Sequence, residues 1–351
     1  MKIATLGNAA AVHTQRWVEH FRARGHDVAL WSLEPGPEGL GARGLEALPL
    51  PGFVRYPLTA PVLRREVRAF APDLVDAHYV PNYGLLGALI GVHPLSVTAW
   101  GSDLLVLGQR GALQRARLRY VLRRADLVLA DAENLAAAAR TLGAPPDRVA
   151  CIPWGVELWR YREAPAREPG LIVSTRRMEP IYDLPTVIQG VAKVMATRQD
   201  TRLVLAGDGP SRSEIERLAA QLLPAGRFQF VGQLDAAGIA EWLGRAEIYV
   251  SASHSDSTSL SLLEAMACGT MPVVSDLEGN REWVKEGEGA RLFPPGDSAA
   301  LAHALEQTLA DPEWRVRARH HNRQVVERRA DHARNMAEIE ARFQALASRA
   351  R

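Results

Sequence analysis

Short apolar runs alternate with longer amphipathic stretches along most of the chain, and this alternation limits the possible folds more than any other feature. Runs such as residues 3–6 and 127–130 have the length of strands that are buried on both faces. The stretches between the runs have the length and the apolar spacing of helices. Strands that alternate with helices predict parallel sheets covered by helices, so we expect an α/β fold.

The same alternation occurs in both halves of the chain. In the first half we expect strands at residues 3–6, 28–31, 74–77, 95–99, 127–130 and 149–152, and helices at residues 14–24, 63–70, 113–124 and 135–142. In the second half we expect strands at residues 171–174, 203–206, 228–231, 248–251, 272–275 and 290–293, and helices at residues 184–195, 214–222, 239–245, 262–267 and 299–310. No strand pattern follows Asp311, where we expect two helices or one bent helix.

The length of the chain predicts two domains. Its 351 residues exceed the roughly 250–300 residues beyond which a single hydrophobic core stops growing. Residues 153–170 carry several prolines and charges without a helix or strand period, so we place a linker there. We expect a Rossmann-like domain at residues 1–160, a second one at residues 161–325, and a C-terminal helix at residues 326–351 that could pack back on the first domain. Doubly wound sheets bind ligands at the carboxyl ends of their strands, so the site should span both domains.

Composition and charge exclude several classes of protein. A formal net charge of +2 is too small for a nucleic-acid-binding protein. Two cysteines cannot form a disulfide framework, which favours a reducing compartment. The chain starts with a strand and has no apolar run long enough to span a membrane, so we expect no signal peptide and a cytoplasmic location. The arginine-rich residues 110–124 could form a solvated helix face or rest on the inner face of an anionic membrane.

Most of the common catalytic and cofactor motifs are absent. The loop that follows the first strand begins with Gly7 and Asn8 but lacks the further glycines of a dinucleotide-binding loop. Gly7 could admit a phosphate to the backbone, or it could form a plain tight turn. The sequence has no P-loop, no C-x-x-C pair, no H-E-x-x-H helix and no G-x-S-x-G elbow. We therefore expect neither a metal site nor a cofactor.

The densest chemical signal lies in residues 251–269, where a hydroxyl-rich loop follows a strand and leads into a helix. Seven residues separate Asp256 from Glu264 in this segment. The loop and the helix N-terminus would offer N–H donors to a diphosphate, and a carboxylate inside the helix could accept hydrogen bonds from a diol. A diol beside a diphosphate suggests the ribose of a nucleotide.

This segment closely resembles the E-x7-E motif region of the retaining glycosyltransferases of family 4, which belong to the glycosyl transferases group 1. The resemblance continues through residues 16–28, 100–103, 152–156, 206–210, 231–232, 266–274 and 279–282. It implies the GT-B fold, in which two Rossmann-like doubly wound domains face an interdomain cleft. The first domain would lie on the acceptor side, and the second would bind the nucleotide sugar.

The resemblance also implies roles for individual residues. Glu264 corresponds to the second carboxylate of the motif, which holds the ribose hydroxyls. Asp256 corresponds to the first carboxylate, which lies near the donor sugar, and its side chain is one methylene shorter. The donor-binding set that the resemblance implies consists of Gly7, Asn8, Asp208, Gly232, Ser257, Thr258, Ser259, Leu260 and Glu264.

A fixed positive charge for the donor diphosphate must come from arginine, because only three of the 42 basic residues are lysines. In the family, an arginine and a lysine after the first strand of the second domain supply this charge. Here Arg176 and Arg177 follow that strand, and Tyr182 or Asp183 stands near the expected lysine. Sequence spacing does not rank the two arginines.

The first domain offers weaker candidates for the sugar and the acceptor. Trp100 stands where many relatives have a histidine, and it could stack on a sugar or pack in the core. Asp103 could bind a sugar hydroxyl or cap the following helix. His13 and His78 are further candidates on the acceptor side.

The resemblance implies a metal-independent transferase that moves a hexose-type sugar from a nucleoside-diphosphate sugar to an unidentified hydroxyl acceptor, with retention at the anomeric carbon. The acceptor could be a glycan, a lipid-linked compound or a small molecule. Two alternatives are a sugar-nucleotide 2-epimerase of the same fold and a non-catalytic nucleotide-sugar-binding partner of another transferase.

Overall fold

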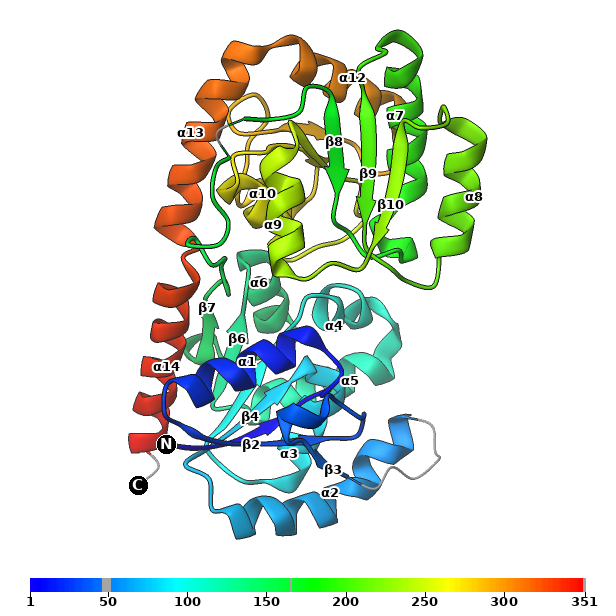
Figure 1. The fold of residues 1–351 in the computed structure, drawn as a ribbon. Helices are drawn as coiled ribbons and strands as arrows, with labels where there is room; N and C mark the ends of the chain where they lie inside the picture. Colours follow the sequence, from blue (N-terminus) through cyan, green and yellow to red (C-terminus); the bar gives the residue numbers. More distant parts are fainter. Residues whose placement is uncertain (46–51, 165, 350–351) are drawn as a thin grey trace. The chain divides into compact units, whose positions relative to one another are not determined.

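The computed structural model describes residues 1–45, 52–164 and 166–349 (Figure 1). The chain divides into two compact units. Unit 1 comprises Met1–Ile152 with Met336–Arg351, and unit 2 comprises Pro153–Asn335. The sequence patterns place the corresponding junctions at residues 160/161 and 325/326, several residues from the divisions of the structure.

Unit 1 contains a parallel sheet with the strand order β3-β2-β1-β4-β5-β6-β7. Its strands are β1 (Lys2–Leu6), β2 (Asp27–Ser32), β3 (Arg43–Gly44), β4 (Leu74–His78), β5 (Leu95–Thr98), β6 (Leu127–Ala130) and β7 (Val149–Cys151). The order runs outward in both directions from the pair β1 and β4, which pair in parallel. This reversal opens a crevice at the carboxyl ends of the two strands, as in other doubly wound sheets.

Helices cover the sheet of unit 1. They are α1 (Val12–Ala23), η1 (Glu38–Leu40), α2 (Gly52–Phe70), the π-helix η2 (Tyr79–Gly84), α3 (Leu85–Ile90), α4 (Ser102–Leu105), η3 (Leu107–Gln109), α5 (Gly111–Arg124), α6 (Glu133–Thr141), η4 (Pro146–Arg148) and most of α14 (His332–Arg349). The ring of Phe343 in α14 stacks on Phe21 in α1, with 5.5 Å between the ring centroids. Glu340 accepts hydrogen bonds from Arg24 and His26, both at 3.0 Å, which fixes α14 to the end of α1.

Unit 2 contains a second parallel sheet, with the strand order β10-β9-β8-β11-β12-β13. Its strands are β8 (Leu171–Ser174), β9 (Arg202–Ala206), β10 (Phe228–Gly232), β11 (Ile248–Ser251), β12 (Met271–Ser275) and β13 (Arg291–Phe293). Alternate side chains enter two different cores. Ile248 and Val250 belong to one hydrophobic cluster, whereas Tyr249 belongs to the other. Both faces of the sheet are therefore covered, as the apolar runs predict.

The helices of unit 2 are η5 (Pro180–Tyr182), α7 (Leu184–Thr197), α8 (Arg212–Leu222), α9 (Ala236–Arg245), α10 (Leu260–Ala267), α11 (Glu278–Arg281), α12 (Ser298–Ala310) and α13 (Pro312–Arg329). Helices α7, α8 and α12 supply one core, and α9 and α10 supply the other. Figure 1 shows α7 and α9 on opposite sides of the strands β8 to β10. The order reverses between β8 and β11, which places a second crevice at their carboxyl ends.

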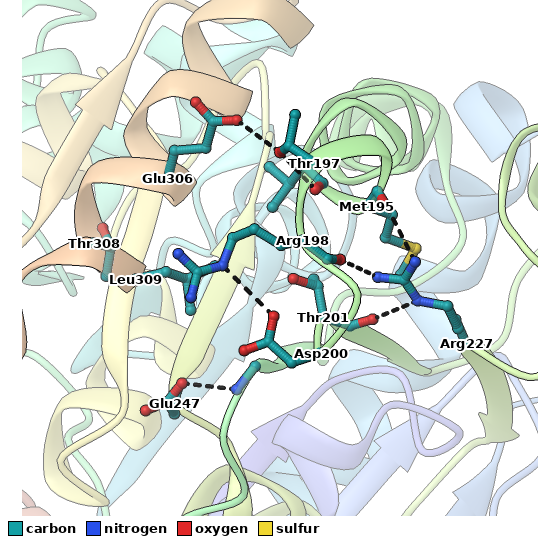
Figure 2. A network of polar contacts seen from close by, with 12 residues as sticks. Met195, Thr197, Arg198, Asp200, Thr201, Arg227, Glu247, Glu306, Thr308 and Leu309 are labelled. Carbon is teal, nitrogen blue, oxygen red and sulfur yellow. Dashed lines mark hydrogen bonds and ion pairs between the residues drawn. The ribbon is translucent and has the colours of Figure 1, made fainter.

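At the amino ends of the strands, opposite this crevice, an arginine binds three backbone carbonyl groups. Arg227 donates from Nε to the carbonyl of Thr201 at 3.0 Å, from Nη1 to that of Met195 at 3.1 Å, and from Nη2 to that of Arg198 (Figure 2). These carbonyls lie at or just beyond the end of α7, where the last turn of a helix leaves carbonyl groups without partners inside the helix. These bonds tie the end of α7 to the start of β10.

Each predicted strand lies within one residue of an observed strand, and the segment after Asp311 forms two helices. The sequence patterns did not predict β3, α3, α4, α11, the short helices η1 to η5 or the first part of α2. Helix α2 contains Pro57 and Pro61, which are signals against a helix in a sequence.

Candidate functional site

The crevice of unit 2 joins two loops that are far apart in the sequence. The loop after β8 supplies Arg176, and the loop after β11 supplies Asp256. Arg176 donates from Nη2 to Oδ2 of Asp256 at 2.6 Å and from Nη1 to Oγ of Ser259 at 2.8 Å. The Arg176 guanidinium also lies over the ring of Tyr182, 4.1 Å from the ring centroid. Three contacts therefore fix the orientation of one cation.

The two neighbouring arginines differ sharply in environment. The side chain of Arg176 is 6% exposed. The side chain of Arg177 is 64% exposed and pairs with Glu179 at 2.8 Å. Successive side chains of an extended segment point in opposite directions, which explains the difference. Of the two, only Arg176 is built into the crevice.

Burial and charge act against each other within the ion pair. Burial alone would lower the pKa of Arg176, but the Asp256 carboxylate and the nearby tyrosines raise it above its usual value. Burial raises the pKa of Asp256, and Arg176 offsets part of that rise. The arginine therefore remains charged inside a largely desolvated crevice.

The N-terminus of α10 lies beside this cation. Ser259 caps the helix and accepts a hydrogen bond from the backbone of Leu262 at 3.3 Å. Thr258 accepts one from the indole of Trp283 at 3.3 Å. Leu260 begins the helix, so the first-turn N–H groups point toward the loop. The structure thus places the predicted residues Thr258 to Leu260 around an N-terminus that can bind an anion.

Helix α11 holds the other side of this loop. A Cβ atom on Gly279 would lie 2.1 Å from the carbonyl oxygen of Ser257 and 2.6 Å from that of Asp256. Only glycine permits this approach of α11 to the loop.

Glu264 lies four residues inside α10, and the residue is 6% exposed. It lies close enough to Cys268 to affect its thiol. Burial, followed by the charge of Glu264, raises the pKa of Cys268 to about 12. Glu264 is therefore a buried carboxylate and does not belong to a solvated helix face.

The loops after β9 and β10 also lie at the carboxyl ends of the unit 2 strands. A Cβ atom on Gly207 would lie 2.5 Å from the carbonyl oxygen of Arg176, so this glycine lets the two loops touch. Asp208 is half exposed, accepts a hydrogen bond from the backbone of Gly209 at 2.7 Å and pairs with Arg212 at 3.2 Å. Gly232 ends β10 and accepts a hydrogen bond from the backbone of Gly207 at 2.8 Å.

The remaining predicted donor residues, Gly7 and Asn8, lie in unit 1 at the end of β1. A Cβ atom on Gly7 would lie 2.9 Å from Cγ2 of Thr14, so a larger residue there would force the Thr14 side chain to move. Asn8 accepts a hydrogen bond from the backbone of Ala10 at 2.8 Å, which closes the turn.

Aromatic rings gather at the carboxyl ends of β4 and β5 in unit 1. Trp100 makes edge contacts with His13 and His78, with ring centroids 5.4 Å and 5.8 Å apart. His78 is buried and bonds through Nε2 to Oδ2 of Asp76 at 3.0 Å, and this carboxylate also accepts from the indole of Trp17 at 2.8 Å. Asp76 was not predicted, although a carboxylate inside an apolar strand is a usable signal.

Asp103 is fully buried, and its carboxylate is occupied by the backbone. It accepts hydrogen bonds from Val80 at 3.0 Å and from Trp100 and Leu104 at 3.1 Å. Burial raises its pKa to about 6, although these hydrogen bonds oppose the rise. Asp103 lies inside α4, whose N-cap residue Gly101 has no side-chain cap, so these bonds fix the loop before the helix and are not the predicted helix cap.

Among the described residues, no three His, Cys, Asp or Glu side chains gather closely enough to hold a metal ion. The candidate site is therefore a cation, a helix N-terminus and buried carboxylates.

Comparison with known proteins identifies the family. The model of the glycosyl transferases group 1 matches residues 156–325, and that of the glycosyl transferase 4-like proteins matches residues 2–132. This chain belongs to the group 1 glycosyltransferases. The first match includes Arg176, Asp256 and Glu264, and it includes the loops at the carboxyl ends of the unit 2 strands.

Curated relatives and solved structures agree with this assignment. The N-acetyl-alpha-D-glucosaminyl L-malate synthase of Bacillus anthracis is 28% identical over 69% of this glycosyltransferase and 66% of its own length. The phosphatidyl-myo-inositol mannosyltransferase of Mycobacterium tuberculosis is 28% identical over 87% of this chain and 85% of its own length. Several other matches cover less than two thirds of the relative, for example 37% of the Mycobacterium leprae mannosyltransferase.

The fold is that of GT-B enzymes. The structure of Anabaena HepE in complex with UDP-glucose matches with a TM-score of 0.83, 18% identity, and coverage of 99% of this chain and 100% of that one. The sucrose-phosphate synthase of Thermosynechococcus elongatus matches with a TM-score of 0.82, 21% identity and 99% coverage of both chains.

Proposed function

We propose that this glycosyltransferase moves a hexose-type sugar from a nucleoside-diphosphate sugar to a hydroxyl acceptor, with retention at the anomeric carbon. The observation that carries the proposal is the fixed Arg176 at the N-terminus of α10, on the helix that also holds Glu264. A diphosphate needs fixed positive charge and N–H donors at one place. A ribose needs a carboxylate that accepts from its two hydroxyls, which is the role we give Glu264.

The same residues suit the proposed chemistry. The bond between the anomeric carbon and the diphosphate oxygen breaks as the acceptor oxygen forms its bond on the same face, and the leaving diphosphate takes the acceptor's proton. Negative charge grows on the diphosphate during this step. Because Asp256 and Ser259 already hold Arg176 in place, its charge can stabilise the leaving group with little reorganisation. Asp256 then acts through Arg176 as well as near the donor sugar.

The donor and the reaction type are open to a direct test. A thermal-shift screen with uridine, guanosine and adenosine diphosphate sugars should reveal one stabilising donor, because a ligand at 100 times its dissociation constant adds about 2.7 kcal/mol. Incubation of that donor without an acceptor then separates the alternatives. An epimerised donor would indicate the 2-epimerase, and binding without turnover under any acceptor would indicate the non-catalytic partner. Absence of stabilisation by every donor would refute the proposal.

The names of two relatives include L-malate and phosphatidyl-myo-inositol. For this enzyme we propose a hydroxyl-bearing acceptor of the small-molecule, lipid-linked or glycan kind. Tests with one acceptor of each class, with the stabilising donor in excess, would identify the class.

We further propose a cytoplasmic enzyme that can contact a membrane surface through α5. Among the described residues, no helix combines the length and the apolarity needed to cross a bilayer. Leu113 at the start of α5 is 88% exposed, and Arg115, Arg119 and Arg123 form an exposed stripe four residues apart. Such a face suits anionic lipid headgroups. Cosedimentation with phosphatidylglycerol vesicles but not phosphatidylcholine vesicles is expected, and equal behaviour with both would contradict the contact.

A further inference from the structure

The aromatic contact of Arg176 comes from a different segment than its two hydrogen bonds. Asp256 and Ser259, which accept the hydrogen bonds, follow β11. Tyr182, the last residue of η5, covers the guanidinium. The N–H groups of a guanidinium lie in one plane, so the two bonds leave the group free to tilt about the line that joins the acceptors. A ring centroid 4.1 Å from the charge blocks one face, and the position of Tyr182 therefore helps to set the direction of the cation.

Asp183 fixes the chain directly after this ring. Its φ of +41° is a left-handed conformation, which aspartate tolerates better than most residues do. Its carboxylate caps α7, because Oδ1 accepts from the backbone of Thr186 at 3.3 Å and Oδ2 accepts from the hydroxyl of Thr186 at 2.6 Å. The end of η5 is thus tied to the first turn of α7.

His254 ties the same chain to the segment after β11. Its Nε2 atom lies 3.2 Å from Oδ2 of Asp183, and its backbone N–H donates to the carbonyl of Ile181 at 2.9 Å. The two contacts therefore hold the residues on either side of Tyr182. Two residues after His254, the same segment supplies Asp256. One short stretch of chain thus holds the aromatic contact and one hydrogen-bond acceptor of the buried cation.

We propose that His254 is a positioning residue of the donor site. Through Asp183 it holds Tyr182 against the guanidinium, and the guanidinium is thereby aimed at the donor diphosphate. The inference rests on the proposed function, because the diphosphate is assigned to this cation there. The His254 side chain is 50% exposed, and an ion pair of this exposure adds little to the stability of a fold. Its loss should therefore disturb diphosphate binding more than it disturbs the fold.

The test compares binding of a nucleoside diphosphate with binding of the nucleoside alone. Calorimetry would use UDP, GDP and ADP, one of which the wild type is expected to bind, and the matching nucleoside would be measured by displacement of that diphosphate. His254→Ala removes the side chain, and His254→Gln keeps an N–H donor for Asp183. His321→Ala is the matched control, because His321 is 39% exposed and lies 3.8 Å from Glu288, which precedes β13 at the amino ends of the strands.

We expect His254→Ala to weaken diphosphate binding roughly tenfold, the size of a partly desolvated cation–π contact. Nucleoside affinity and the midpoint of thermal unfolding should stay close to those of the wild type. His254→Gln should retain most of the diphosphate affinity, and His321→Ala should bind like the wild type. Diphosphate binding by His254→Ala at the wild-type level would overturn the inference, and so would an equal loss of diphosphate and nucleoside affinity.

A double-mutant cycle checks the route through Tyr182. Tyr182→Leu removes the ring over the guanidinium, so a further change of His254→Ala should then have little effect, because residues that act through each other are not additive. Additive losses from the two substitutions would contradict the route. Failure of the wild type to bind any of the three diphosphates would count against the proposed function instead.

Discussion

Arg176 and Arg177 show how strongly one step along the backbone changes a residue. Both carry the same side chain, but Arg176 is enclosed by Asp256, Ser259 and Tyr182, whereas Arg177 reaches solvent beside Glu179. The enclosed guanidinium has lost its freedom before any ligand arrives. This preorganisation makes it the better candidate for stabilising charge in a transition state.

The first prediction compares these two arginines. Arg176→Gln should lower kcat roughly 10²-fold or more, because a charge-assisted contact to the leaving diphosphate is lost. Arg177→Gln should retain near-normal turnover, because its partner is a surface glutamate. Steady-state kinetics with the stabilising donor decide between them, and circular dichroism checks folding. Equal effects of both substitutions would contradict the assignment.

Glu264 gives a second prediction at this scale. Glu264→Gln keeps the size of the side chain but removes its charge, so donor binding should weaken by roughly 1.5–3 kcal/mol. Calorimetry with UDP and 2′-deoxy-UDP checks the reason. The deoxy analogue should bind more weakly than UDP to the wild type, and the difference should shrink in the variant. An unchanged difference would show that this carboxylate does not hold the ribose.

Asp103 gives a prediction on pH. Its pKa is raised to about 6 in the folded protein, above the ordinary value near 3.8. The folded state therefore holds this proton more tightly than the unfolded state does. The stability contributed by the protonated carboxyl is complete below about pH 4 and is lost as the pH rises through about 6. Carbon-detected NMR titration of Asp103 should show a midpoint near pH 6, and a midpoint at or below 4 would contradict the prediction.

At the scale of elements, strands were easier to predict than helices. Runs such as residues 127–130 and 171–174 are apolar on both faces, so their pattern needs no tertiary information. The start of α2 was missed because proline is a local signal against helix, and packing on α3 and in the core of unit 1 overrides that signal. The site was only partly predictable for a similar reason. Spacing indicated Asp256 and Glu264, but the choice between Arg176 and Arg177 depends on how the loop turns after β8.

Helix α11 contacts the loop before α10 through Gly279, and this contact predicts that a larger residue at Gly279 disturbs donor binding. Gly279→Ala would introduce a Cβ atom 2.1 Å from the carbonyl oxygen of Ser257, so the loop before α10 must shift. We expect a large fall in donor affinity with a smaller loss of thermal stability, measured by calorimetry and thermal unfolding. Gly39→Ala is the control, because no atom lies within 4 Å of its added Cβ. Equal donor affinity of both variants and the wild type would contradict this support.

At the scale of the whole molecule, the charge for the diphosphate is proposed to come from the protein. Arginine and a helix N-terminus can supply that charge without a divalent ion. Excess EDTA should therefore leave the rate of transfer unchanged. A complete loss of activity that magnesium restores would overturn this proposal.

Unit 1 is assembled from two separate stretches of chain, whereas unit 2 is continuous. Phe343 and Glu340, which pack on Phe21 and bind Arg24, are made after all of unit 2. Domains usually fold in the order in which they leave the ribosome. Here the later domain can complete its core while the earlier one still lacks its closing helix. The apolar surface of α1 that Phe343 covers therefore stays uncovered until the chain has been made beyond unit 2.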